Sequence, residues 1–348
     1  MTARLAIATA SLVLIALSLA LSLEGQTQTE TDFSHGVSEF RAGNYSSAAV
    51  LLERAETASP GTTDALLFES KALIHLSNFP AAEHVLQRYL ASHAGSSDGL
   101  YLLGFVLNRE NRPAESLAIY ARAEAISSPT GDDLKIIGLN YVLLDDYASA
   151  IQWLQTSVER DPNNKDAWYY LGRALYTKTR IAEARHAFLM VLTLDPQNSR
   201  AENNLGLIYE SEGQPAAAIQ AYRRAISWQE LSPHPSEQPY VNLGNLLMEQ
   251  GQTAEALAQL EKAVALAPEN AFCHMTLGIA YRQQHRLEQA QHEMEKATRL
   301  DPDNSTAHYQ LGRVYKEQHD LGRAQAEFEK TAELKARAAG LKPSPPPQ

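Results

Sequence analysis

The sequence contains very little cysteine. Cys273 is the single cysteine among 348 residues, which excludes an intramolecular disulfide framework and any zinc site built from several cysteines. No cysteine lies near the apolar N-terminal run, so a lipoprotein anchor is also excluded. Because 44% of the residues are hydrophobic, we expect packing of apolar side chains to hold the fold together.

A net positive charge is also absent. Lysine and arginine number 30 against 41 aspartates and glutamates, which gives a formal charge of −11. Proteins that bind nucleic acids neutralise phosphates with clustered basic residues, so this composition argues against a nucleic-acid partner. A basic or apolar protein surface is a more suitable partner for an acidic chain.

Catalytic motifs are the third absence. No stretch has the spacing of a phosphate loop, a dinucleotide-binding glycine pattern, a nucleophile elbow or a zinc-protease helix. His292-Glu293 lacks a second histidine four residues further on, and the eleven histidines show no paired spacing. Cys273, next to His274, is interpreted as a small packing residue. We therefore expect no enzymatic activity, no cofactor and no metal.

Residues 5–23 form an uncharged apolar run between Arg4 and Glu24. A small-x-small pattern at 20–22 suits a signal peptidase, so residues 1–25 are interpreted as a signal peptide. The run also reaches the roughly 18 residues of a spanning helix, which keeps an uncleaved membrane anchor open. Positive charge precedes the run and acidic residues follow it. Both readings predict an exported protein, periplasmic or extracellular, or one anchored to the inner membrane by residues 5–23.

A 34-residue period runs through the rest of the chain. A leucine or isoleucine followed by glycine marks seven units, with a large residue three positions after the glycine, and two more degenerate units precede them. This spacing places these residues on one face of a helix, where glycine lets a neighbouring helix approach closely. The marker glycines are Gly104, Gly138, Gly172, Gly206, Gly244, Gly278 and Gly312.

A second helix is predicted in every unit. Twelve residues after each glycine comes a small residue, and four further on a bulky one, as with Ala150 and Leu154. Small residues at the helix crossing and large ones beside it predict a tight antiparallel hairpin. A turn such as Asp161-Pro162-Asn163-Asn164 separates successive hairpins, because proline ends one helix and asparagine can cap the next.

This helix-turn-helix period resembles the tetratricopeptide repeat family, above all in the segment from Trp168 to Pro196. The resemblance implies an all-α fold, a right-handed superhelical α-solenoid of about nine helical hairpins. The units run over 29–62, 63–96, 97–130, 131–164, 165–198, 199–232, 237–270, 271–304 and 305–338. Because the units fill 29–338, we expect no separate catalytic domain, which needs about 50 residues.

Two proline-rich segments interrupt or follow the repeats. Residues 233–236 are an insertion between the first six repeats, over 29–232, and the last three repeats, over 237–338. The insertion is either a hinge or a longer surface loop that leaves the stacking intact, since loop insertions cost little entropy. Residues 339–348 are predicted to form a disordered, extended tail.

In the tetratricopeptide family the first helix of each unit lines a groove that binds peptides. First-helix positions that packing does not require are therefore our candidate binding residues. They are Tyr101, Phe105, Lys135, Tyr169, Arg173, Tyr176, Asn203, Asn245, Arg282, Arg313 and Lys316. Their aromatic and basic side chains predict a protein partner, an extended peptide or helix with apolar and acidic residues. The alternative for each residue is that it only packs or faces water.

The resemblance implies a non-catalytic scaffold or adaptor outside the cytoplasm that assembles an envelope or secretion complex. Membrane contact is expected only through the N-terminal segment. One alternative is a structural homo-oligomer whose end units stack on one another. Another is an accessory subunit that presents substrates to a separate enzyme such as a glycosyltransferase, because Asn242-Leu243-Gly244-Asn245 also resembles the repeats of O-linked N-acetylglucosamine transferases.

Overall fold

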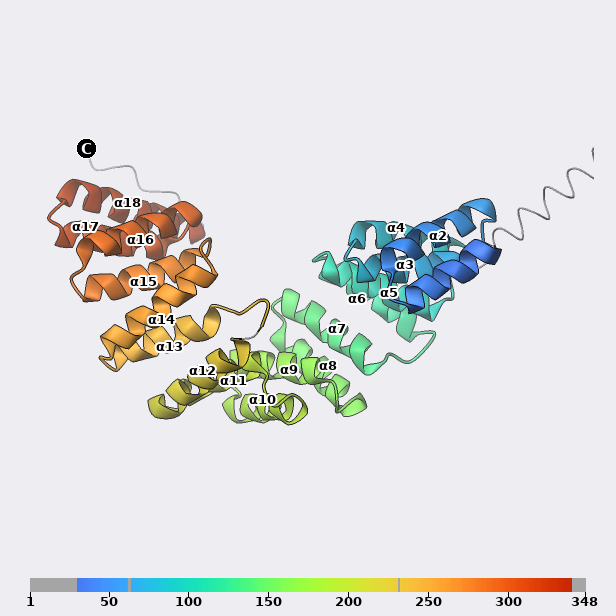
Figure 1. Cartoon of the computed structure of the whole chain (residues 1–348), viewed down its shortest axis with the longest axis horizontal. Helices are drawn as coiled ribbons and strands as arrows, with labels where there is room; N and C mark the ends of the chain where they lie inside the picture. Colours follow the sequence, from blue (N-terminus) through green and yellow to red (C-terminus); the bar gives the residue numbers. More distant parts are fainter. Residues whose placement is uncertain (1–29, 62–63, 231, 340–348) are drawn as a thin grey trace, which may run out of the picture. The chain divides into compact units, whose positions relative to one another are not determined.

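A computed structural model describes residues 30–61, 64–230 and 232–339, and the secondary structure in these ranges is helical throughout (Figure 1). Residues 30–41 are helical. They are followed by α2 (Tyr45–Ala58), α3 (Ala65–His75), α4 (Phe79–Ser92), α5 (Ser97–Arg109), α6 (Pro113–Glu124), α7 (Gly131–Leu143), α8 (Tyr147–Arg160), α9 (Lys165–Thr177), α10 (Ile181–Leu194), α11 (Ser199–Ser211), α12 (Pro215–Gln229), α13 (Gln238–Glu249), α14 (Thr253–Leu266), α15 (Ala271–Gln283), α16 (Leu287–Leu300), α17 (Ser305–Glu317) and α18 (Leu321–Ala338). The prediction of an all-α solenoid of about nine helical hairpins is confirmed.

Some predictions concern residues outside these ranges. The signal peptide or anchor falls within residues 1–29, and all of the tail except Ala339 falls within residues 340–348. Among the helices that the structure describes, none combines the length and the apolar character needed to cross a bilayer. The signal peptide or anchor and the disordered tail stay predictions, because residues 1–29 and 340–348 lie outside the described ranges.

The described residues form two compact units, one within residues 1–179 (called unit 1 from here on) and one within residues 180–348 (unit 2), which meet in sequence between α9 and α10. Within each unit every helix packs on the next. The first helices of successive hairpins also contact one another, as α3, α5, α7 and α9 do in unit 1 and α11, α13, α15 and α17 in unit 2. Each unit thus presents a continuous layer of first helices.

The marker glycines explain how closely the helices of a hairpin cross. A Cβ atom built on Gly104 of α5 would lie 2.6 Å from the ring of Tyr120 on α6, and one on Gly138 of α7 would lie 2.7 Å from Leu154 on α8. Real Cβ atoms do not tolerate such distances. The predicted pairing of glycine with a bulky residue sixteen positions later is confirmed at both crossings.

Asparagine caps the helix that follows each proline turn, as the sequence predicts. The Oδ1 atom of Asn164 accepts a hydrogen bond from the backbone N–H of Ala167 at 3.0 Å, and Asn198 accepts one from Ala201 at 2.9 Å. Such caps satisfy N–H groups that the first helical turn leaves without partners. The turn sequence therefore fixes where each first helix begins.

The turn inside each hairpin has one backbone conformation that the sequence analysis did not identify. The same position in all nine repeats has a positive φ, between 54° and 82°. It is occupied by Gly43, Ser77, Asn111, Asp145, Thr179, Gly213, Gly251, His285 and His319. Because only three of these are glycine, which adopts positive φ at no steric cost, the turn had no recognisable sequence signature.

The insertion at 233–236 forms a loop tied to the end of α12. The side-chain amide of Gln229 donates to the carbonyl of Ser236 at 2.7 Å and accepts from its backbone N–H at 3.0 Å. Helices α12 and α13 pack on each other across this loop. The division between compact units lies at residue 179 instead of at the insertion.

Candidate functional site

Three of the predicted binding residues meet in one pocket of unit 1. This aromatic pocket has a volume of about 340 Å³ and lies between α3, α5, α6 and α7. It is lined by Ile74, Tyr101, Leu102, Phe105, Tyr120, Asp132, Asp133, Lys135 and Ile136. The structure therefore brings Tyr101, Phe105 and Lys135 together on neighbouring first helices.

The aromatic side chains of this pocket are held in place by packing and hydrogen bonds. The hydroxyl of Tyr101 donates to the backbone carbonyl of Ser127 at 2.6 Å, and its ring lies 5.8 Å from that of Tyr120. Phe105 packs edge-on against Phe79 at 6.5 Å. Burial is the main reason that the pKa of Tyr101 is raised, so this phenol remains a neutral donor. A fixed aromatic wall is suited to receiving an apolar side chain.

Lys135 is paired with an acidic side chain of its own helix. Its ammonium group lies 2.6 Å from the carboxylate of Asp132, one turn earlier on α7. The hydrogen bond from Lys135, supported by one from Asn164, lowers the pKa of Asp132. The aromatic pocket therefore contains an ion pair, and Asp133 adds a second carboxylate to its wall.

Arg173 belongs to a second pocket of unit 1, the arginine pocket, with a volume of about 380 Å³. Helices α5, α7 and α9 line it together with the turn after α5 and the start of α8. The lining residues are Asn108, Arg109, Asn111, Leu139, Val142, Leu143, Tyr147, Tyr170, Arg173, Ala174 and Thr177. The predicted residues Tyr169 and Tyr176 lie half-buried on α9 but are outside this lining.

The arginine pocket also contains residues that the sequence analysis missed. Arg109 and Asn111 follow the last first-helix position that we considered, and Tyr147 opens a second helix. Each was passed over because the search took a single position in the last turn of each first helix, the position of Tyr176, Arg282 and Lys316. A search that included the residue after that position would have found Arg109.

Two predicted binding residues of unit 2 form hydrogen bonds with other side chains of the same chain. Asn203 is 7% exposed and accepts a hydrogen bond from the amide of Asn242 at 2.9 Å. Arg282 is 8% exposed and its guanidinium donates to Glu317 at 2.7 Å. Both pairs join first helices of successive hairpins, α11 with α13 and α15 with α17. These hydrogen bonds therefore connect successive first helices of unit 2.

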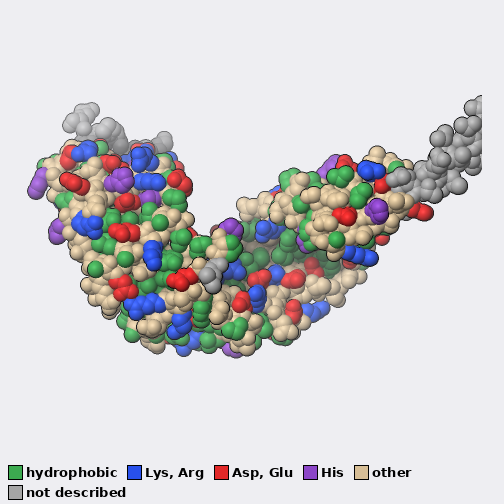
Figure 2. All heavy atoms as spheres, viewed as in Figure 1, with side chains coloured by type: hydrophobic (Ala, Val, Ile, Leu, Met, Phe, Trp, Pro, Cys, Tyr) green, Lys and Arg blue, Asp and Glu red, His purple; other side chains and the backbone are tan. Residues whose placement is uncertain are grey.

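The other predicted residues of unit 2 are more accessible. Asn245 lies half-buried on α13, Arg313 half-buried on α17, and Lys316 is exposed one turn later. On the visible face of unit 2, acidic and basic side chains are interspersed (Figure 2). The positive charge predicted for the last two hairpins is therefore partly balanced, at Arg282 by Glu317.

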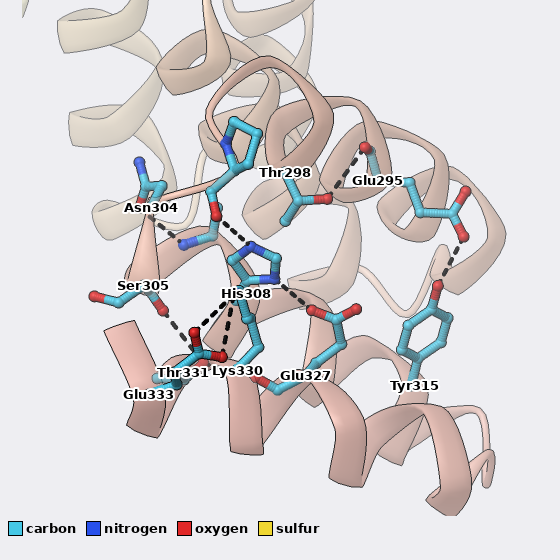
Figure 3. A network of polar contacts seen from close by, with 12 residues as sticks. Glu295, Thr298, Asn304, Ser305, His308, Tyr315, Glu327, Lys330, Thr331 and Glu333 are labelled. Atoms are coloured by element: carbon cyan, nitrogen blue, oxygen red, sulfur yellow. Dashed lines mark hydrogen bonds and ion pairs between the residues drawn. The ribbon is translucent and has the colours of Figure 1, made fainter. Parts of the chain in front are cut away.

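Unit 2 repeats one polar arrangement in two hairpins. The Nδ1 atom of His308 lies 2.6 Å from a carboxylate oxygen of Glu327, and its Nε2 atom lies 3.0 Å from the carbonyl of Pro302 (Figure 3). His274 has the same contacts, 34 residues earlier, with Glu293 at 2.6 Å and Pro268 at 2.9 Å. Each histidine thus ties the turn before a first helix to the second helix of its hairpin.

These two histidines connect elements of their own hairpins. Across the described ranges, no group of three histidine, cysteine, aspartate or glutamate side chains is arranged to hold a metal ion. Cys273 is buried, and burial raises its pKa to about 11. A thiol in this state is a poor nucleophile at neutral pH. The absence of enzymatic activity stays a prediction.

Family models described as tetratricopeptide repeat match residues 39–104, 137–199, 177–234, 235–303 and 281–341. Between residues 39 and 341, only residues 105–136 lie outside these matches.

Curated relatives include anaphase-promoting complex subunit 3 of Schizosaccharomyces pombe, 21% identical over 71% of this chain. BBSome complex member BBS4 of Bos taurus is 25% identical over 60% of this chain. The chain spans only 36% and 39% of the length of these two relatives.

Among solved structures, the APC/C hetero-tetramer Cut9-Hcn1 matches with a TM-score of 0.56 and 18% identity. The match covers 84% of this chain and 62% of the other. It supports the fold, whereas the repeat matches identify the family. This chain belongs to the tetratricopeptide repeat family.

Proposed function

We propose that this protein is a non-catalytic adaptor that binds a segment of another protein on the first-helix layer of unit 1. The aromatic pocket carries the proposal, because it gathers Tyr101, Phe105 and Lys135 from two neighbouring first helices into one cavity. A pocket with an aromatic wall and a few fixed polar groups suits a protruding apolar side chain. Two curated relatives are named as members of multi-protein complexes, which agrees with a role in assembly.

We further propose that the adaptor works outside the cytoplasm, in an envelope or secretion complex. The apolar run at 5–23, preceded by Arg4 and followed by Glu24, supports this location. A phosphatase that is active only outside the cytoplasm, fused after Ala339, should be active in cells. An inactive but intact fusion would contradict the location and leave the binding proposal standing.

The binding proposal is tested by affinity capture from solubilised envelope with the full chain as bait. The variant Phe105→Ala with Lys135→Ala should lose the partner, because it removes one aromatic wall and one ion pair of the pocket. Circular dichroism should show unchanged helical content in this variant. A partner that both baits capture equally would refute binding at the aromatic pocket. Absence of any partner, with the parent eluting as an oligomer, would support the self-assembling alternative.

A further inference from the structure

The aromatic pocket and the arginine pocket share two helices. In the aromatic pocket α5 contributes Tyr101 and Phe105, and in the arginine pocket it contributes Arg109. Helix α7 likewise contributes Lys135 to the first and Leu139 to the second. Eight residues separate Tyr101 from Arg109, which corresponds to about 12 Å along an α-helix.

The arginine pocket has a positive charge and an apolar floor. Arg109 and Arg173 line it, and no aspartate or glutamate is among its lining residues. Leu139, Val142 and Leu143 form the floor, and Leu143 is 46% exposed although its side chain is large and apolar. Charge of one sign beside an accessible apolar surface favours a ligand with a carboxylate next to apolar groups.

The two arginines are engaged to different extents. Arg109 lies over the ring of Phe79 at 5.4 Å, a cation–π contact that holds the guanidinium in place. Arg173 is exposed, and within the described part of the chain no carboxylate lies at ion-pair distance from it. Arg173 is therefore the cation best able to pair with a carboxylate from outside.

The acidic residues nearest in sequence, Glu110, Asp145 and Asp146, do not line the pocket. Glu110 pairs with Arg112 at 2.9 Å. The carboxylate of Asp146 caps α8 by accepting from the backbone N–H and hydroxyl of Ser149 at 3.1 and 2.6 Å. Asp145 is exposed in the turn after α7 and is outside the lining.

Buried hydrogen bonds fix the shape of the pocket. Asn108 in its wall donates to Asn140 at 2.9 Å, Asn140 donates to Ser116 at 2.8 Å, and Ser116 donates to the carbonyl of Gly104 at 2.6 Å. Asn140 and Ser116 are fully buried. This chain of bonds joins α5, α6 and α7, so the walls are formed before a ligand arrives, which reduces the entropic cost of binding.

We propose that the two pockets together recognise a short extended segment of a partner protein with two anchors. A large aliphatic or aromatic side chain occupies the aromatic pocket, and an acidic side chain further along the segment pairs with Arg173 in the arginine pocket. This inference rests on the proposed adaptor function and adds to it the chemistry of the recognised segment.

The test is selection of phage-displayed random twelve-residue peptides on the immobilised full chain in mild detergent. Enriched peptides are then synthesised, and their affinities are measured by fluorescence anisotropy for the parent and three variants. Arg173→Glu removes the proposed ion pair and adds repulsion, and Phe105→Ala opens the aromatic pocket. Arg122→Glu is the matched control, because Arg122 is exposed on α6 and outside both pockets.

Enriched peptides should contain an acidic residue and a large apolar one. Arg173→Glu should weaken their binding about tenfold or more, Arg122→Glu less than about twofold, and added salt should weaken binding to the parent. Peptides that depend on Phe105 but not on Arg173, or that lack an acidic residue, would overturn this inference and leave the adaptor function intact. If no peptide is enriched, both proposals fail.

Discussion

Units 1 and 2 differ in what their first helices present. In unit 1 Phe105 and Arg173 line two pockets and are available to a ligand. In unit 2 Asn203 and Arg282 form hydrogen bonds with side chains of the next first helix. First helices of one repeat type can therefore provide a binding surface or hold successive repeats together, and unit 1 does both, because Asn108 also donates to Asn140.

The largest expected effect treats both units alike. Gly138→Val in unit 1 and Gly244→Val in unit 2 should each destabilise their unit by about 3 kcal/mol or more, because a Cβ would lie 2.7 and 2.6 Å from the facing leucine. Thermal unfolding followed by circular dichroism measures this effect. Gly95→Ala is the control, since a Cβ there meets open space. Equal losses of stability at all three positions would contradict a close helix crossing at Gly138 and Gly244.

The second prediction concerns Glu69, a buried carboxyl of unit 1. Glu69 is 6% exposed, and its Oε2 atom has no hydrogen-bond partner within the described ranges. Burial, with Glu53 nearby, raises its pKa to about 7, whereas in the unfolded chain the pKa is about 4.5. The folded state therefore binds the proton more tightly, and stability is lost as the pH rises from about 4.5 to 7.

Glu69→Gln should consequently stabilise unit 1 by on the order of 2 kcal/mol at pH 8 and change little at pH 4. Chemical denaturation at the two pH values measures the difference. Glu53→Gln should reproduce only a small part of it, since burial is the larger cause. A gain that is the same at both pH values would mean that the Glu69 carboxyl does not titrate as proposed.

The third prediction compares Arg282, which connects two first helices, with Arg173, which is proposed to bind a partner. Arg282→Ala should cost about 1–2 kcal/mol of stability, because it removes a charged hydrogen bond at a nearly buried site and leaves Glu317 unpaired. Arg173→Ala should change stability by less than about 0.5 kcal/mol and affect only binding. Urea denaturation of both variants provides the comparison. If Arg173→Ala is as destabilising as Arg282→Ala, the distinction between the two units is wrong.

The fourth prediction compares one repeat position in the two units. His308→Phe in unit 2 removes contacts to Glu327 and Pro302, whereas the equivalent Trp168 in unit 1 donates a hydrogen bond to the carbonyl of Pro162 at 2.9 Å. The histidine variant should lose about 1–2 kcal/mol, since each bond contributes about 1 kcal/mol. Removing Glu327 as well should add little. Thermal unfolding of the single and double variants tests this coupling.

The smallest expected effect is a gain at the turn between the two units. Thr179 has a φ of 56°, a conformation that a β-branched residue adopts only with strain. Thr179→Asn should stabilise the protein by about 0.5–1 kcal/mol, because asparagine tolerates this region. The reciprocal change Asn111→Thr, at the same repeat position with φ 60°, should be destabilising. Thermal unfolding should show a higher melting temperature for Thr179→Asn and a lower one for Asn111→Thr; changes of the same sign would contradict the prediction.

The sequence predicted those features that depend on contacts at a fixed spacing. Gly104 faces Tyr120 sixteen residues later, and Asn164 caps the helix that starts at the next residue. Both contacts follow from helix geometry within one repeat, so the pattern alone is sufficient.

The sequence did not predict features that depend on contacts between repeats. Arg282 and Glu317 are 35 residues apart, and whether their side chains meet is decided by rotamers and packing. The arginine pocket combines three hairpins, and no periodic pattern in the sequence shows that Arg109 and Arg173 line the same pocket. The charge and accessibility of the predicted groove could therefore be judged only once the helices were in place.

The restriction of contacts to neighbouring helices has a mechanical consequence. Within each unit, helices contact those one or two places away in the sequence, so hairpins would carry a pulling force in series. The hairpin with the weakest packing should give way first, without requiring the distant ones to open. Each hairpin that opens under load would release 34 residues, which extend the chain by roughly 110 Å.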